Sequence, residues 1–177
     1  MALFTGKGDG GTTQVFGCDQ GRISKSSEVP EALGALDELN AFLGFVKMHP
    51  EVPARIAAGL KKMQEALFII QAEIAGSDKR IKAEAVEELS VAVNQIEKEI
   101  PPITKFSIAG GTELSAKLDV ARTIARRAER RITAAAASGR AVSDPARAYI
   151  NRLSSLLFAY ARLVNHLANV PEEVPCY

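Results

Sequence analysis

The segment SDPARAYINRLSSLLFAYARLVNHLANVP, residues 143–171, decides the fold class of this chain. Ser143 before Asp144-Pro145 is a start signal for a helix, and Pro171 is a stop signal. Between them the apolar residues return at steps of three and four, as on one face of an α-helix. They are Ile150, Leu153, Leu157, Tyr160, Val164 and Leu167. The segment therefore predicts one long amphipathic helix.

The same period recurs in four earlier segments, each bounded by proline or glycine. The first begins near Pro30, a residue favoured in a first turn, and runs to about Lys47. The stripes of the next three are Ile56, Leu60, Met63, Leu67, Ile70 and Ile74, then Val86, Leu89, Val93, Ile96 and Ile100, then Leu114, Leu118, Ala121, Ala125, Ala128 and Ile132. We expect an all-α fold, a five-helix antiparallel bundle over residues 30–170.

Residues 1–29 hold no helical period and are rich in glycine, serine and threonine. We expect them to form a glycine-rich N-terminal loop segment. A chain of 177 residues has the usual size of one domain, so loop and bundle are expected to form a single domain, residues 1–177.

Composition limits the class of protein. Lys and Arg number 22 and Asp and Glu 21, which gives a net charge of +1 and argues against a nucleic-acid or membrane-surface binder. Hydrophobic residues at 47% exclude a disordered chain. The N-terminal MALFTGKGDGG lacks the apolar core of a secretory signal, and no apolar run approaches the ~20 residues of a membrane span. We expect a cytoplasmic protein with no nucleic-acid or membrane partner.

The two cysteines, Cys18 and Cys176, lie far apart and in no CxxC arrangement. Unpaired thiols in a reducing cytosol are the expectation, with a disulfide or a metal role as the alternatives.

Alanines on the fourth helical segment allow a close approach of another helix. Ala121, Ala125 and Ala128 lie on one narrow stripe. The stripe fits packing within the chain and fits an oligomer interface equally well.

The segment TGKGDGGTT, residues 5–13, concentrates glycines, hydroxyls and a lysine. Such a loop can present N–H and O–H donors to phosphate oxygens, while the alternative is a flexible terminus. Gly6-x-Gly8-x-x-Gly11 has the dinucleotide-binding spacing, but no βαβ unit follows it. Thr12 stands where a Walker A motif requires lysine.

The densest charge cluster is ARTIARRAERR, residues 121–131. Arg122, Arg126, Glu129 and Arg130 fall on one helix face, whereas Arg127 and Arg131 point elsewhere. Three guanidiniums around one carboxylate suit a polyphosphate. The alternatives are a solvated, salt-bridged face and an RNA-binding face; the neutral net charge and the lack of interleaved aromatics disfavour the latter.

Four polar or aromatic residues stand apart from these motifs. Asn151 can hydrogen-bond a ligand or cap a neighbouring element. Phe106 is expected to plug the core, or else to face a ligand from its loop. His49 and His166 have no partner at metal-ligand spacing and are expected to be ordinary core or surface histidines.

Six motifs, taken in order, resemble the PduO-type ATP:cob(I)alamin adenosyltransferases, or corrinoid adenosyltransferases. The motifs are TGKGDGGTT, Lys25, EALGALDELNAFLG, FSIAGG, ARTIARRAERR and YINRLSSLLFAYAR. The resemblance implies a five-helix bundle assembled as a homotrimer with active sites at subunit interfaces. It implies transfer of the 5′-deoxyadenosyl group of ATP to cob(I)alamin, with Mg²⁺, and release of triphosphate. A non-catalytic scaffold that senses ATP or adenosylcobalamin is the alternative function.

The resemblance also implies roles for particular residues. Phe106 would close off the lower face of cobalamin, Arg126 and Asn151 would act in catalysis, and Arg122 would support the site. The ATP contacts would be Thr5, Gly6, Gly8, Asp9, Gly11, Thr12, Thr13, Lys25, Arg126, Arg127, Glu129, Arg130 and Asn151; no side chain is assigned as a metal ligand. A cobalamin reductase or an acceptor enzyme would be a further partner. The chain departs from many relatives at Ala109, where they have proline, and at Asp119, where they have histidine.

Overall fold

A computed structural model describes residues 4–16 and 21–177 of the chain. Cys18 lies outside these residues, and Cys176 is a free, exposed thiol. The helices are α1 (Glu28–Lys47), α2 (Ala54–Ala75), α3 (Ala83–Glu99), α4 (Glu113–Ala137) and α5 (Asp144–Leu167). Two short strands, β1 (Thr12–Thr13) and β2 (Ile23–Ser24), pair antiparallel before α1. Among the described helices, none is both long and apolar enough to cross a bilayer.

The helix ends follow the predicted signals closely. Ser143 is the N-cap of α5, and its Oγ accepts a hydrogen bond from Ala146 N at 3.3 Å. Gly76 ends α2 with φ +105°, a left-handed conformation that glycine adopts without strain. The start of α1 differs by two residues from the expectation. Ser27 is extended and the helix begins at Glu28, so Pro30 is its third residue, still inside the turn that needs no intrahelical N–H.

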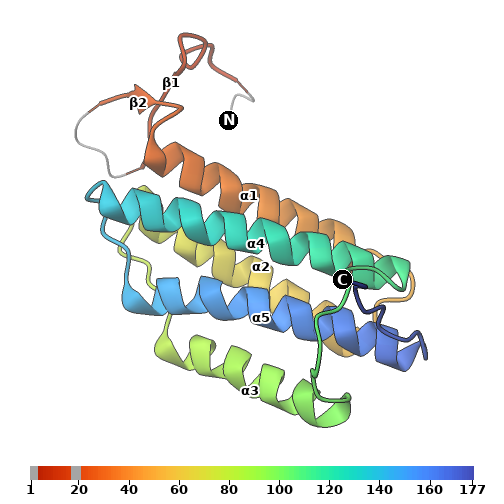
Figure 1. Ribbon diagram of the computed structural model, residues 1–177. Helices are drawn as coiled ribbons and strands as arrows, with labels where there is room; N and C mark the ends of the chain where they lie inside the picture. Colours follow the sequence, from red (N-terminus) through yellow and green to blue (C-terminus); the bar gives the residue numbers. More distant parts are fainter. Residues whose placement is uncertain (1–3, 17–20) are drawn as a thin grey trace.

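The predicted five-helix bundle is confirmed for the described residues, with one helix on its outside (Figure 1). α4 lies between α1 and α5, α2 packs on α1, and α3 packs on α5. Figure 1 shows α3 running in the same direction as α5, while the other neighbouring helices are antiparallel. Since α5 separates α3 from α4, the linker of residues 100–112 has to cross the C-terminal end of α5 to begin α4.

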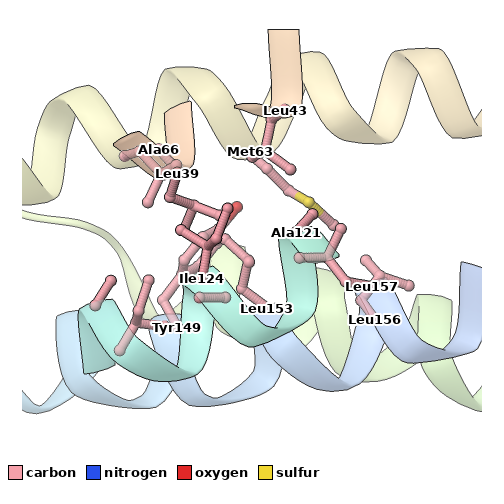
Figure 2. Close-up of a cluster of buried hydrophobic side chains, with 14 of the residues drawn as sticks. Leu39, Leu43, Met63, Ala66, Ala121, Ile124, Tyr149, Leu153, Leu156 and Leu157 are labelled. Carbon is pink, nitrogen blue, oxygen red and sulfur yellow. The ribbon is translucent and has the colours of Figure 1, made fainter. Parts of the chain in front are cut away.

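The core lies where the four central helices meet. Figure 2 shows one cluster to which every one of these helices contributes: Leu39 and Leu43 from α1, Met63 and Ala66 from α2, Ala121 and Ile124 from α4, and Tyr149, Leu153, Leu156 and Leu157 from α5. All of them are buried. Burying such side chains supplies roughly 1.5–3 kcal/mol each, which is the main force holding the bundle together.

The alanine stripe of α4 is used inside the chain. Ala121, Ala125 and Ala128 are each 0% exposed. Of the two interpretations of this stripe, packing within the chain is therefore confirmed. The stripe is therefore not evidence for an oligomer interface.

A close approach between α2 and α5 gives a stability prediction. A Cβ added at Gly59 would overlap Tyr160 Oη and lie 3.1 Å from Tyr160 Cζ, and Tyr160 is buried. Gly59→Ala is expected to lower the free energy of unfolding by about 1–3 kcal/mol. Helix propensity alone would instead raise it by ~0.5–1 kcal/mol. Urea unfolding of the variant measures whether the free energy of unfolding falls or rises.

The control is the same substitution in a Tyr160→Phe background. Removing the hydroxyl relieves most of the overlap, so Gly59→Ala should cost less there. An equal cost in both backgrounds would contradict the steric explanation.

Candidate functional site

The arginine face of α4 meets α5 through one hydrogen bond. Glu129 Oε1 accepts from Asn151 Nδ2 at 2.8 Å. Arg126 and Arg130, on the same helix face, are exposed and form no ion pair with any residue the structure describes. The sequence interpretation of a salt-bridged face does not hold for these two guanidiniums. They remain available to an anionic ligand.

Arg127 and Arg131 point away from Arg126 and Arg130, as predicted, and the structure places them against α1. Arg127 pairs with Glu38, and Arg131 Nη2 lies 3.6 Å from Glu31 Oε2. These ion pairs are half-exposed, so each stabilises the fold by less than ~1 kcal/mol. The arrangement separates two ion-paired arginines on one face from two unpaired arginines on the other.

Arg122 connects the arginine face to the N-terminal half of α4. Its Nε donates to Asp119 Oδ1 at 2.8 Å, and its guanidinium carbon lies 5.7 Å from the centre of the Phe158 ring. Asp119 is only 8% exposed. Since the helix rises about 1.5 Å per residue, Asp119 lies roughly 10 Å along α4 from Arg126.

The glycine-rich loop forms two tight turns. Asp9 N donates to Gly6 O and Gly11 N donates to Gly8 O, both at 3.1 Å. Gly6 (φ +68°) and Gly11 (φ +76°) hold left-handed conformations that other residues seldom adopt. Residues 5–13 therefore form two hydrogen-bonded turns in the structure.

Lys25 lies against this loop. Its N–H donates to Gly11 O at 2.9 Å, and a Cβ added at Gly8 would lie 3.2 Å from Lys25 Nζ. Arg22 adds a second cation, whose Nε donates to Thr12 Oγ1 at 2.8 Å. The structure thus gathers the predicted loop residues and Lys25 into one basic unit, to which sequence reasoning had not assigned Arg22.

The loop and the arginine face are not joined within one chain. Among residues 4–16 and 21–27, none makes a hydrogen bond or ion pair to α4 or α5. Figure 1 shows β1 and β2 standing beyond the N-terminal end of α1. Two basic units of the candidate site, the loop unit and the arginine face, therefore lie on one chain with no hydrogen bond or ion pair between their described residues.

A cavity of about 500 Å³ opens at the other end of α4 and α5. Its wall includes Asp119 and Phe158 together with the linker and the C-terminal tail, and its lining residues are Ser107, Ile108, Ala109, Gly110, Gly111, Ser115, Asp119, Phe158, Ala161, Arg162, Asn165, Val170, Pro171, Glu172 and Glu173. Phe106 lines an adjoining cavity of about 270 Å³ and is 80% exposed. The prediction that Phe106 plugs the core is wrong, because its ring stands on the linker facing outward.

The histidines take no part in a metal site within the described residues. His49 is buried, with Nδ1 accepting from Glu51 N at 3.2 Å and Nε2 3.9 Å from Glu113 Oε2, and His166 is exposed. The hydrogen bond from Lys117 holds the pKa of Glu113 below its usual range. In the parts of the chain that the structure describes, no three His, Cys, Asp or Glu side chains are grouped to hold a metal.

Comparison with known proteins shows which family this chain belongs to. A family model described as cobalamin adenosyltransferase matches residues 3–164. The chain belongs to the cobalamin adenosyltransferase family.

Relatives within the family match over almost the whole chain. A corrinoid adenosyltransferase of Citrobacter freundii is 38% identical over 170 residues, which are 91% of this chain and 93% of that protein. The PduO corrinoid adenosyltransferase of the same organism is 36% identical over 176 residues and 96% of this chain, and this chain covers 51% of it. The chain thus spans about half the length of the PduO relatives.

The solved structures of the family show the same fold. A variant of a PduO-type ATP:corrinoid adenosyltransferase from Lactobacillus reuteri, complexed with cobalamin and ATP, superposes with a TM-score of 0.91 at 28% identity. The alignment covers 99% of this chain and 100% of that one. The expectation of a fold of this family is confirmed.

Sequence reasoning missed the residues that organise the linker. Arg162 and Asn165 are both buried on α5, and each binds a residue more than 50 positions away. The one signal was the pair of polar residues on an otherwise apolar helix face. A polar residue there needs a hydrogen-bond partner, but the helix pattern does not identify it.

Proposed function

We propose that this protein transfers the 5′-deoxyadenosyl group of ATP to cob(I)alamin, forming adenosylcobalamin and releasing triphosphate. The proposal rests on one observation. Arg126 and Arg130 lie beside the Glu129–Asn151 hydrogen bond and form no ion pair with any described residue. In a chain similar to enzymes complexed with ATP and cobalamin, this face suits the triphosphate.

The chemistry needs charge neutralisation rather than a base. The Co(I) centre supplies the electron pair that forms the Co–C5′ bond. The C5′–O bond breaks, and its electron pair leaves on the triphosphate. No proton moves in this step, so the protein has to hold C5′ in line with cobalt and stabilise the leaving anion.

The proposed ATP contacts comprise the two basic units described above. From the loop unit they are Thr5, Gly6, Gly8, Asp9, Gly11, Thr12, Thr13 and Lys25. From the helical unit, which is the arginine face of α4 with Asn151 of α5, they are Arg126, Glu129, Arg130 and Asn151. Arg127 would join them only by leaving its ion pair with Glu38 on the α1 side. Mg²⁺ would bind with the triphosphate, because this ion keeps most of its ligands from phosphates and water. Asp9 and Glu129 are the carboxylates of these two sets.

The larger cavity is the proposed corrinoid side of the site. It is open, and the linker that bears Phe106 forms part of its wall. Arg122 supports both sides, since it binds Asp119 at the cavity and stands on the helix face of Arg126. At Asp119, where many relatives have histidine, the carboxylate of this chain is engaged by Arg122.

A complete site requires a second chain in this proposal. The loop unit and the helical unit belong to one chain, but their described residues share no hydrogen bond or ion pair, which supports a homotrimer with the loop of one subunit on the arginine face of its neighbour. Each chain would supply a single domain, residues 1–177, whose loop segment binds nucleotide. The compartment would be the cytoplasm, and a cobalamin reductase or acceptor enzyme a further partner.

One assay tests the proposal. Protein is mixed with Mg-ATP and chemically reduced cobalamin, and the visible spectrum is followed while triphosphate is measured. Adenosylcobalamin and triphosphate are expected in equal amounts, with neither formed when protein is omitted. Bound nucleotide without either product would contradict the activity and favour the sensor function.

A further inference from the structure

The linker between α3 and α4 is fastened to α5 at both ends. At its start, Arg162 Nη2 donates to Pro101 O at 3.0 Å. At its end, Asn165 Nδ2 donates to Gly110 O at 2.9 Å. Arg162 and Asn165 are three residues apart, so they lie on the same face of α5. The linker crosses α5 over this face.

Asn165 binds two elements at once. While its Nδ2 holds Gly110, its Oδ1 accepts from Thr112 N at 2.9 Å and from Thr112 Oγ1 at 3.1 Å. Thr112 is the N-cap of α4. The side chain is 7% exposed, and each of these bonds is partly buried. Asn165 therefore fixes the end of the linker relative to the start of α4.

Gly111 completes this contact. Its φ is +96°, and a Cβ there would lie 2.5 Å from Asn165 Nδ2. The backbone approaches the amide so closely that a side chain does not fit. This makes Asn165 and the Gly110-Gly111 pair parts of one clamp.

The middle of the linker has no such support. In the described chain, residues 102–107 donate or accept no hydrogen bond, and the next bond is Ile108 N to Glu173 O at 2.8 Å. Phe106 lies in this unbonded stretch and is largely exposed. The backbone at Phe106 is therefore held by the bonds that flank this stretch, at Pro101 before it and at Ile108 and Gly110 after it.

We propose that Asn165 is the positioning residue for Phe106: its amide donation to Gly110 sets where the linker holds the aromatic ring over the corrinoid. The inference rests on the proposed function and concerns the same site. Asn165 does not touch the reacting atoms and acts through the linker alone. Losing the donation releases the linker at Gly110, while the bonds at Pro101 and Ile108 remain. Phe106 would then cover the lower face of the corrinoid less completely, a lower axial ligand could bind Co(II), and cobalt would accept an electron less readily.

The test uses two variants that divide the bonds of Asn165. Asn165→Asp keeps the oxygen that accepts from Thr112 and replaces the donor with an oxygen facing Gly110 O. Thr112→Ala keeps the N–H bond to Asn165 Oδ1 and the Asn165 donation to Gly110 O. It removes the hydroxyl, which donates to Asn165 Oδ1 and accepts from Ser115 N, both at 3.1 Å. The second variant is the matched control, since it weakens the N-cap of α4 and leaves the linker anchored.

Two readouts follow the linker. One is the fraction of bound cob(II)alamin in the four-coordinate form, measured by absorption and electron paramagnetic resonance in the presence of ATP. The other measurement needs no cobalamin. The chain has no Trp, so Phe106→Trp introduces a single tryptophan, and the anisotropy of its fluorescence reports motion of the linker.

Asn165→Asp is expected to lower the four-coordinate fraction and kcat by about tenfold or more, with the KM for ATP unchanged within about twofold. It should also lower the anisotropy of Trp at position 106, while Thr112→Ala alters neither readout. The proposal is overturned if Asn165→Asp retains the wild-type fraction or anisotropy, or if Thr112→Ala lowers them equally. Failure of the wild-type protein to form adenosylcobalamin would instead overturn the proposed function. The anisotropy would still test whether Asn165 holds the linker in place.

Discussion

Arg126→Ala is expected to lower the rate of adenosylcobalamin formation by about two to three orders of magnitude, because one charge-stabilising donor is lost at the leaving group. Arg126 has no ion-pair partner among the described residues, so its removal leaves no buried charge behind. The free energy of unfolding should change by less than ~0.5 kcal/mol, as for other exposed positions. Steady-state kinetics and circular dichroism of the purified variant measure both effects.

Arg131→Ala is the matched control on the same helix. Arg131 lies 3.6 Å from Glu31 of α1 and stands on the face that points away from the Glu129–Asn151 bond. Its loss removes a half-exposed ion pair and should leave the rate within about twofold of wild type. If Arg126→Ala retained wild-type activity, or if Arg131→Ala were equally impaired, Arg126 would have no role at the triphosphate.

Asn151→Ala extends this prediction to the partner helix. The variant loses the amide that donates to Glu129 Oε1, and a comparable fall in rate with unchanged helicity is expected. Glu129→Gln is its companion, because a neutral amide there can still contact Asn151 while the charge is gone. A rate unaffected by Asn151→Ala would remove this residue from the site.

The helices were predictable from sequence because apolar periodicity is a local signal. The stripe from Ile56 to Ile74 predicts which side of α2 is buried, and each of its six residues is 0% exposed. Proline and glycine marked the helix ends within a few residues. The orientation of Arg127 and Arg131 away from Arg126 was predictable for the same reason, since helical geometry alone sets it.

The linker was not predictable in this way. Asn165 and Gly110 are 55 positions apart, and Arg162 and Pro101 are 61 apart. Each contact exists because α5 lies between α3 and α4, which is a property of the topology and not of any one helix. The exposure of Phe106 has the same origin, since a linker crossing over α5 carries its side chains on the outer surface of the bundle.

Helix α4 joins the two halves of the proposed site. Its N-terminal half lines the larger cavity through Asp119, and its C-terminal half carries Arg126 and Glu129. Arg122 lies between them, bound to Asp119 and stacked near Phe158. Because Asp119, Arg122 and Arg126 project from one helix, the distance between the corrinoid side and the triphosphate side is set by the fold rather than by a flexible loop.

Mixing two inactive variants is expected to restore activity if the sites lie between subunits. Lys25→Ala disables the loop unit and Arg126→Ala disables the helical unit. In a mixed trimer, an intact loop from one variant can meet an intact arginine face from the other. After unfolding and refolding of an equal mixture, random assembly gives an active pair at about a quarter of the interfaces. The mixture should then show roughly a quarter of wild-type activity, far above either variant alone.

The control separates this result from a monomeric site. Lys25→Ala mixed with a Lys25→Ala, Arg126→Ala double variant contains no intact loop and should stay inactive in any assembly. Size-exclusion chromatography with light scattering of the same samples measures the oligomer. Absence of recovery in refolded trimers would place the loop and the arginine face of one site in the same chain. That arrangement would require the loop to leave the position it has beyond the N-terminal end of α1, because its described residues make no hydrogen bond or ion pair to the arginine face of the same chain.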